Sequence, residues 1–207
     1  MKKYELLVED TITFFGVQLF RIKALISFSG IEKGEVGGYI ASEKNLSQSG
    51  NAWVSGNAEV YGNARVSGNA WVSGNAEVYG NAEVYGNARV YGNARVYGNA
   101  EVSGNAWVSG NAEVSGNARV SGDARVSGDA RVSGDADYIV FKNTWSSGRY
   151  FTYTKSNKKW KVGCFYGNGY ELIEKAYKDS QKSGDFYKAY VEFVEKLEEI
   201  EKIHKEQ

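Results

Sequence analysis

The sequence contains very few of the residues that enzymes use for acid–base and metal chemistry. Its 207 residues include one histidine, His204, and one cysteine, Cys164. A single cysteine excludes an internal disulfide and fits a reducing compartment, so we expect a cytoplasmic protein. A single histidine excludes any zinc site built from two or three imidazoles. These scarcities predict a protein without metal or cofactor.

The sequence also lacks net charge and long apolar runs. Lysine plus arginine number 25, as do aspartate plus glutamate, which removes the global electrostatic case for a nucleic acid or an anionic membrane as partner. No apolar run approaches the roughly 18 residues of a membrane span. The start, "MKKYELLVED", has no signal-peptide apolar stretch. The length allows one or two domains with a sizeable core.

What dominates the chain is a six-residue repeat. The unit Gly-Asn-Ala-x-Val-y runs from Gly50 to Ser133, with Asp in place of Asn at positions 123, 129 and 135. In an extended chain Ala and Val point to one side, and x and y point to the other. Glycine and asparagine accept the left-handed conformation that a corner needs. Short strands joined by such corners predict a β-solenoid.

The variable positions favour a three-sided coil, with three repeats or about 18 residues per turn, over a two-sided coil with two repeats. Residues three repeats apart then stack, and the three repeat tryptophans fall in one column, which a two-sided coil would split. That column reads Trp53, Trp71, Arg89, Trp107 and Arg125. The other two x columns read Glu59, Glu77, Arg95, Glu113, Arg131 and Arg65, Glu83, Glu101, Arg119, Asp137. Most vertical neighbours in those two columns have opposite charges. Tyr61, Tyr79 and Tyr97 form a further outward column.

The repeat frame divides the chain into a solenoid and two caps. Steps of six back from Ala52 and Val54 predict inward residues in a disguised start of the solenoid: Leu46, Ile40, Val36, Phe28, Ala24 and Ile22. We therefore expect an N-terminal β cap at 1–21, in which "YELLVED" and "FFGVQLFRI" form a strand pair. The solenoid follows at 22–136, and a C-terminal α+β domain at 137–207. Such caps cover the open strand edges of a solenoid.

The C-terminal domain is predicted to contain three strands followed by two helices. The strands are "DYIVF", "RYFTYTK" and "KWKVGCF", and the helices are "YELIEKAYKDS" and "DFYKAYVEFVEKLEEIEKIHKE". An apolar stripe on the last helix has two interpretations, packing on the sheet of the domain or an oligomer seam. It comprises Phe186, Tyr190, Phe193, Val194, Leu197, Ile200 and His204.

The repeat resembles the hexapeptide pattern of left-handed β-helix proteins, with Val at the large inward position and Ala at the small one. This resemblance implies a left-handed coil and a homotrimer. The segment "GGYIASEKNLSQSGNAWV", the "GNAxVSGNAxVYG" array and the "VGCF" before two helices are similar to hexapeptide-repeat proteins of bacteriophages and prophages. Members of that group are commonly labelled polymer-forming or acyltransferase-like because of the repeat alone.

The enzymes of this fold use residues that the chain does not have. By the same resemblance, the acyltransferases use a histidine base on an extruded loop, and the carbonic anhydrases use three zinc-bound histidines. The array here has neither histidine nor such a loop, so we expect a protein that is not an enzyme. Asp123, Asp129 and Asp135 lie on three different corners, so a corner role is favoured over calcium binding. Cys164 is interpreted as a buried structural cysteine, and "GNG" at 167–169 as a turn before a helix.

The sequence therefore predicts a binding protein. The Trp/Arg and Tyr columns serve either as stabilising ladders or as a face for a sister subunit or partner, with nucleic acid disfavoured by the alternating charges nearby. Specific recognition is expected in the C-terminal domain, at Trp145, Arg149, Trp160 and Tyr166, with a core role favoured for Trp160. The phage resemblance implies an inhibitor of host antiviral defence in the host cytoplasm, acting on a host protein or a small signalling nucleotide. The alternatives are a virion or scaffold protein and, third, an acyltransferase-like enzyme.

Overall fold

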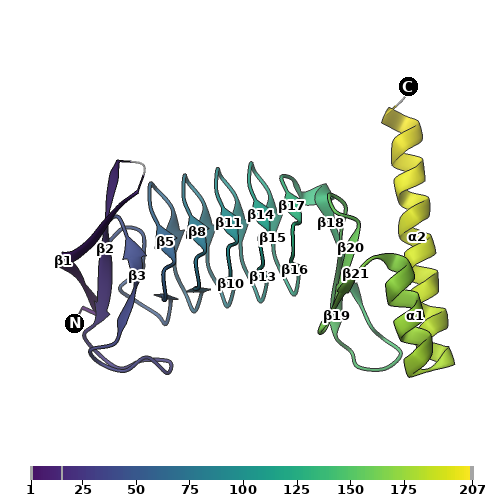
Figure 1. The fold of residues 1–207 in the computed structure, drawn as a ribbon, viewed down its shortest axis with the longest axis horizontal. Helices are drawn as coiled ribbons and strands as arrows, with labels where there is room; N and C mark the ends of the chain where they lie inside the picture. Colours follow the sequence, from purple (N-terminus) through teal and green to yellow (C-terminus); the bar gives the residue numbers. More distant parts are fainter. Residues whose placement is uncertain (1, 15, 206–207) are drawn as a thin grey trace.

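The chain forms an elongated rod with a β cap at one end and an α+β domain at the other (Figure 1). The computed structural model describes residues 2–14 and 16–205. Phe15 of the predicted cap strand and Glu206 of the predicted last helix lie outside these residues, as do Met1 and Gln207. The predicted order of cap, solenoid and α+β domain is confirmed.

The rod consists of two-residue strands that stack in parallel, each on the strand three repeats further along the chain. Arg89 pairs with Trp107 and Val90 with Val108, and the same register recurs along the rod. The strands form three faces, which in spatial order are β4-β7-β10-β13-β16, β6-β9-β12-β15 and β5-β8-β11-β14-β17. The three-sided solenoid is therefore confirmed, and it has about five coils. Its strands are β4 (Trp53–Val54), β5 (Glu59–Val60), β6 (Arg65–Val66), β7 (Trp71–Val72), β8 (Glu77–Val78), β9 (Glu83–Val84), β10 (Arg89–Val90), β11 (Arg95–Val96), β12 (Glu101–Val102), β13 (Trp107–Val108), β14 (Glu113–Val114), β15 (Arg119–Val120), β16 (Arg125–Val126) and β17 (Arg131–Val132).

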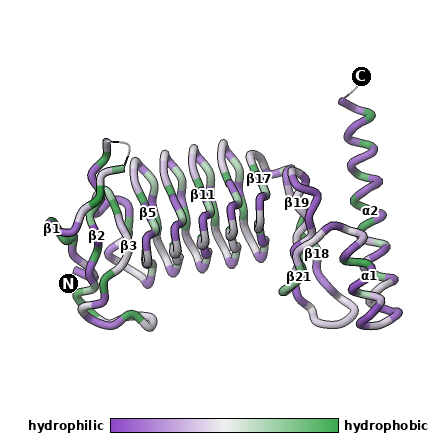
Figure 2. The backbone as a smooth tube through the Cα atoms, in the orientation of Figure 1, coloured by the Kyte–Doolittle hydropathy of each residue, from purple (hydrophilic) through white to green (hydrophobic). Residues whose placement is uncertain are grey.

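Alanine and valine fill the interior of every coil. Each repeat Ala and Val from Ala52 to Val132 is at most 1% exposed, because residues two apart on a strand point to the same side. Figure 2 shows the apolar residues returning at the same places in successive coils. The small and large side chains alternate along the chain, and together they fill a narrow core at high density.

The corners depend on glycine and on asparagine ladders. The corner glycines from Gly50 to Gly128 have φ between 62° and 77°, a region costly for residues with a Cβ. Asparagines on successive coils are hydrogen-bonded in a fixed direction; for example, Asn87 Nδ2 donates to Asn105 Oδ1 at 3.1 Å. The ladders end on Asp123 and Asp129, which accept from Asn105 and Asn111. Aspartate suits this last position because no further coil is present to accept an amide N–H.

The N-terminal cap is the predicted strand pair, but the parallel stack starts later than predicted. Strand β1 (Tyr4–Phe14) pairs antiparallel with β2 (Val17–Ala24), and β2 pairs antiparallel with β3 (Val36–Ile40). Only β3 stacks in parallel on the solenoid, through β5. The prediction that Val36 points inward is wrong, since its side chain is 46% exposed. Between the pairs Arg21–Tyr39 and Lys23–Val36, β3 has one residue more than β2, and this bulge reverses the alternation.

The remaining predicted inward residues of this segment mostly reach the core. Ile22, Ala24, Ile40 and Leu46 are at most 1% exposed, and Phe28 packs against the core with part of its ring exposed.

Side chains of the N-terminal segment satisfy the open carbonyl edge of the first coil. Inside the rod, each such carbonyl accepts from an N–H of the preceding coil, as Ala70 O does from Trp53 N. Ala52 O has no preceding coil and accepts instead from Lys3 Nζ at 2.8 Å, while Ala64 O accepts from Asn45 Nδ2 at 2.8 Å. Burial lowers the pKa of Lys3 to about 8.

The last coil is capped by side-chain oxygens that accept its free N–H groups, one on each face. Arg119 N donates to Asp135 Oδ1 at 2.8 Å, Arg125 N to Thr152 Oγ1 at 2.9 Å and Arg131 N to Ser156 Oγ at 2.8 Å. A short 3-10 turn, η1 (Asp135–Asp137), leads out of the solenoid. The C-terminal domain is thus joined to the rod by hydrogen bonds as well as by the chain.

The C-terminal domain has four strands where three were predicted. These are β18 (Tyr138–Lys142), β19 (Tyr150–Thr154), β20 (Lys159–Val162) and β21 (Phe165–Gly167), in an antiparallel sheet. The predicted strand "KWKVGCF" is split, because Gly163 has a φ of 56° and turns the chain. The two predicted helices are α1 (Gly169–Asp179) and α2 (Gln181–Lys205). Asn168 and Glu171 form a capping box at the start of α1, which confirms "GNG" as a turn before a helix.

The face of α2 that packs on the domain overlaps the predicted stripe only in part. Tyr187, Val191 and Val194 are at most 8% exposed and join the core of the domain. Phe186, Phe193 and Ile200 of the predicted stripe are 39–51% exposed. Of the stripe residues, only Val194 is buried. Phe186 nevertheless stacks on Trp145, and Tyr190 packs against the domain core. The interpretation of the stripe as packing on the domain is therefore confirmed in part. The C-terminal half of α2 projects beyond the sheet (Figure 1).

We predict unequal costs for alanine at two corners with the same backbone conformation. A Cβ at Gly86 would lie 2.9 Å from the backbone nitrogen of Gly104, whereas a Cβ at Gly122 meets nothing within 4 Å. Both substitutions incur the left-handed penalty of roughly 1–2 kcal/mol. Gly86→Ala adds the strain of overpacking, and should lower the free energy of unfolding by about 1–3 kcal/mol more than Gly122→Ala. Urea unfolding measures the difference, and equal losses would contradict this account of the corners.

We also predict a pH dependence that comes from Lys3. Because the folded state lowers the pKa of Lys3 from 10.5 to about 8, it binds fewer protons than the unfolded state between these values. The free energy of unfolding of the native sequence should therefore rise relative to that of Lys3→Met as pH increases from 8 to 10. Urea unfolding at pH 7, 8, 9 and 10 tests this; parallel pH profiles for the two proteins would refute it.

Candidate functional site

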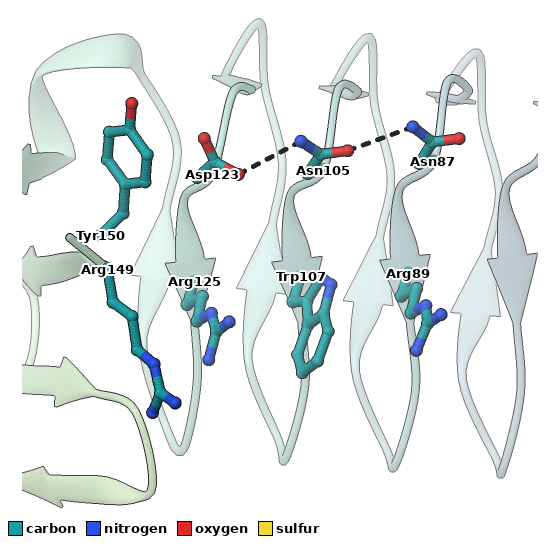
Figure 3. A pocket seen from close by; sticks show the side chains of 8 residues that line it. All are labelled: Asn87, Arg89, Asn105, Trp107, Asp123, Arg125, Arg149 and Tyr150. Atoms are coloured by element: carbon teal, nitrogen blue, oxygen red, sulfur yellow. Dashed lines mark hydrogen bonds between the residues drawn. The ribbon is translucent and has the colours of Figure 1, made fainter. Parts of the chain in front are cut away.

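A groove lies where the Trp/Arg face of the solenoid meets the C-terminal domain (Figure 3). Its volume is about 400 Å³. The solenoid contributes side chains from β10, β13 and β16 and from the adjoining corners, and the domain contributes two residues at the start of β19. The lining residues are Asn87, Arg89, Asn105, Trp107, Asp123, Arg125, Arg149 and Tyr150.

The domain is positioned against this face by the caps of the last coil. The bond from Arg125 N to Thr152 Oγ1 joins β16 to β19. Arg149 and Tyr150 shortly precede Thr152 in the chain, so the same contact sets them at the end of the Trp/Arg column. On the adjacent corner, the ring of Tyr166 lies against Gly128, and its hydroxyl accepts from Asn157 Nδ2 at 3.0 Å. The groove is therefore defined by two contacts between domain and rod.

Three guanidinium groups in the groove have no anionic partner. Among the described residues, Arg89, Arg125 and Arg149 make no ion pair, and their guanidinium nitrogens make no hydrogen bond. Most arginines at the equivalent position on the other faces are paired, such as Arg95 with Glu113 at 3.2 Å and Arg119 with Glu101 at 3.6 Å. Arg89 and Arg125 lack ion pairs because their column, from Trp53 to Arg125, contains no acidic residue. The groove concentrates positive charge on a chain of zero net charge.

Trp107 orders two of these guanidinium groups. The Cζ of Arg125 lies 4.5 Å from the centroid of the Trp107 ring, and that of Arg89 lies 5.4 Å from it. Cation–π attraction holds the guanidinium groups beside the ring without neutralising their charge. Tyr91 adds an edge-to-face contact to Trp107 at 6.2 Å. The tryptophan therefore supports the arginines and has little free ring surface of its own.

The opposite wall of the groove is an amide ladder that ends on a carboxylate. Asn87 Nδ2 donates to Asn105 Oδ1, and Asn105 Nδ2 donates to Asp123 Oδ1 at 3.2 Å (Figure 3). At the mouth, Tyr150 is 39% exposed, and Lys142 Nζ lies 5.5 Å from the centroid of its ring. The two walls thus offer cations on one side and both donors and acceptors on the other.

A second hollow continues the groove along the same face toward the N-terminal cap. It is lined by Trp71, Ser73, Arg89, Tyr91 and Trp107. The two hollows share Arg89 and Trp107, so they form one surface over several coils. Trp71 Nε1 donates to Ser55 Oγ at 3.0 Å, which fixes the ring on the rod.

Of the four residues predicted for recognition in the C-terminal domain, Arg149 alone lines the groove. Trp160 is 2% exposed and lies in the domain core, the role favoured for it. The Trp145 ring stacks on Phe186 with centroids 4.6 Å apart and is half-buried, so a recognition role is corrected to packing. Tyr166 contacts the last coil. Tyr150 was not among the predicted residues, because nothing in the sequence places residues 149–150 beside the solenoid column.

The residues of the predicted Trp/Arg column lie in different surroundings in the structure. Arg89, Trp107 and Arg125 line the groove, and Trp71 lines its extension. The prediction that Trp53 is exposed is wrong, because the N-terminal cap covers its side chain, which is 0% exposed. The rings of Phe28 and Tyr4 lie against the Trp53 ring, with centroid distances of 5.5 and 6.4 Å.

The tyrosine column is a stacked ladder. Tyr61, Tyr79 and Tyr97 have successive centroid distances of 5.1 and 5.0 Å, with rings 3° from parallel. Burial raises the pKa of Tyr61 and of Tyr79 above the usual value for tyrosine. The stacking supports the stabilising interpretation of this column.

Cys164 is exposed, which corrects its interpretation as a buried residue. The turn at Gly163 places it on the connection between β20 and β21. Among residues 2–14 and 16–205, no group of three or more His, Cys, Asp or Glu side chains could hold a metal ion. Within the same residues, no helix has both the length and the apolar character needed to cross a membrane.

The repeat matches a known family model. The YdcK Beta solenoid repeat matches at residues 58–74, 82–94, 88–104, 94–110, 112–128 and 124–136. All these segments lie within the solenoid, and the chain is a β-solenoid repeat protein. No curated protein matches the chain.

Proposed function

We propose that this β-solenoid repeat protein is a non-enzymatic binding protein that holds an anionic partner in the groove. The observation that carries the proposal is the set of three guanidinium groups, Arg89, Arg125 and Arg149, without carboxylate partners. A guanidinium group without a counter-charge can form charge-assisted hydrogen bonds with a ligand that supplies one. The rigid rod favours this role, because a preorganised surface loses little entropy when it binds.

The lining of the groove supports binding over turnover. Arginine stays protonated at neutral pH and cannot act as a general base. The lining also includes no serine, cysteine or histidine. His204, which stands near the end of α2, is exposed and is not among the lining residues. An acyltransferase-like enzyme is therefore the least supported alternative.

For the biological role, we propose that the protein inhibits a component of host antiviral defence in the host cytoplasm by stoichiometric binding. The resemblance of the repeat and its flanking segments to phage and prophage hexapeptide proteins motivates this role, and the groove supplies a surface for it. The target is a host protein or a small signalling nucleotide. The alternative is a virion or scaffold protein, for which the rod would serve as a spacer.

We predict that expression of the chain in bacteria with one defined defence system raises the plating efficiency of a sensitive phage at least tenfold for one such system. The triple variant Arg89→Gln, Arg125→Gln, Arg149→Gln should lose this effect. A control triple variant, Arg65→Gln, Arg119→Gln, Arg131→Gln, removes the same charge from the other two faces and should retain it. Thermal unfolding of the purified variants verifies that all are folded.

Two outcomes would contradict these proposals. Absence of relief in every defence system tested, together with incorporation of the protein into purified virions, would reject the inhibitor role and support the structural alternative. Equal relief by both triple variants would keep the inhibitor role and show that it does not depend on the groove. Turnover of acetyl-coenzyme A with an amine or sugar acceptor would instead favour the enzyme.

We further propose that the protein is a homotrimer, as the hexapeptide resemblance implies. The Trp/Arg column was a candidate face for a sister subunit, and the burial of Trp53 removes one residue from that face. Exposed apolar side chains remain on α2, at Phe193, Ile200 and Ile203. Light scattering at micromolar concentration should give three times the chain mass of 22.8 kDa, and Phe193→Glu should lower it if α2 forms the seam. A monomer mass for the native sequence would reject the trimer.

A further inference from the structure

We propose that the groove between the Trp/Arg face and β19 is a binding site for a nucleoside phosphate. This inference rests on the proposed binding function and specifies its ligand. The net charge of the lining is the first observation. Arg89, Arg125 and Arg149 contribute three positive charges and Asp123 one negative charge, which leaves a surplus of two. A ligand with two or more negative charges matches this surplus.

Guanidinium groups match the geometry of phosphoryl oxygens, as they do that of carboxylates. Each presents several N–H groups in one plane, which can bond two oxygens of a phosphate at once. Arg89 and Arg125 both pair in register with Trp107, so their strands lie two coil spacings apart, about 10 Å. Arg149, which directly precedes β19, reaches the same groove (Figure 3). Cations distributed in this way can bind a chain of phosphates better than a single compact ion.

The opposite wall distinguishes an organic phosphate from an inorganic one. Asp123 accepts one hydrogen bond from Asn105, and its carboxylate has no donor group of its own. An inorganic polyphosphate near this carboxylate would be repelled, whereas a sugar hydroxyl or a base amino group can donate to it. The amide of Asn105 lies next to Asp123 in the same row and can bond a donor or an acceptor on a sugar or base edge. The ladder wall therefore favours a nucleoside over bare phosphate.

A flat surface for a base is present at the mouth of the groove. Tyr150 is 39% exposed and follows Arg149 directly, while the faces of Trp107 are taken by Arg89 and Arg125. Nucleobases stack on tyrosine rings and on guanidinium planes. Tyr150 and Arg149 are thus the residues that the base would contact, with the phosphates toward Arg125 and Arg89.

The size of the groove and its surroundings favour a single nucleotide over a nucleic acid strand. A volume of about 400 Å³ lies at the lower end of the range of small-molecule sites. On the neighbouring columns, Glu101 and Glu113 neutralise most of the arginines, so a longer polyanion leaving the groove sideways would find few free cations.

Isothermal titration calorimetry with the full chain at low salt tests the proposal. The probes are ATP, CTP, inorganic triphosphate and a six-nucleotide oligo(dT). We expect at least one of the two nucleotides to bind at least tenfold more tightly than triphosphate and than the oligonucleotide. Arg125→Gln and Arg149→Gln should each weaken nucleotide binding at least tenfold, and Tyr150→Leu should weaken it several-fold. Arg119→Gln, a paired arginine on another face, should leave it within twofold.

Three results would overturn the proposal: no binding of either nucleotide at 1 mM, tighter binding of triphosphate than of both nucleotides, or tighter binding of the oligonucleotide. Equal weakening of nucleotide binding by Arg119→Gln and by Arg125→Gln would also overturn the proposal. Binding would then depend on the overall charge of the protein and not on the groove. If no nucleotide binds but the triple groove variant still abolishes defence relief, this inference fails while the proposed function stands. If nucleotides bind and no defence is relieved, the groove assignment stands and the inhibitor role fails.

Discussion

The structure depends on one backbone interaction, the hydrogen bond from an N–H of one coil to a carbonyl of the next coil. Trp53 N to Ala70 O, Ser55 N to Val72 O and Asn57 N to Gly74 O are successive examples on one face. This bond fixes three repeats to each coil and places equivalent positions of the repeat directly above one another. Stacked columns of Asn, Tyr and Trp/Arg follow from it, and so does an interior of alternating Ala and Val. Corner glycines are required because adjacent coils approach so closely that a Cβ would contact the next backbone.

A ladder of this kind leaves one row of carbonyls open at its start and one row of N–H groups open at its end. Part of each row is satisfied by side chains from outside the repeat, and other carbonyls of the first coil accept from the backbone of the N-terminal segment, as Ala58 O does from Tyr39 N. Lys3 and Asn45 donate at the first coil, while Asp135, Thr152 and Ser156 accept at the last. These contacts prevent the end-to-end association that exposed strand edges favour. They also fix the C-terminal domain against the rod, so the capping contacts and the geometry of the groove have the same origin.

The groove combines a regular and an irregular part of the molecule. The solenoid supplies Arg89, Trp107 and Arg125 at fixed coil spacing, on the one face whose column lacks acids. The domain supplies Arg149 and Tyr150 from a strand end, free of the repeat. Glutamates on the other two faces neutralise most of their arginines, so the positive surface lies mainly on one side of the rod. A chain with no net charge thereby presents a local site for an anion.

The sequence by itself determined the solenoid, because every coil repeats the same local preferences and one register satisfies them all. It also determined which residues share a column, including Asn87, Asn105 and Asp123 at the corners. It could not reveal the bulge that exposes Val36, the burial of Trp53 beneath the cap, or the turn at Gly163. Only the tertiary structure brought Arg149 and Tyr150 to the Trp/Arg column. The domain has no repeat, so its placement follows from contacts between residues distant in sequence, such as Arg125 with Thr152, which no local pattern encodes.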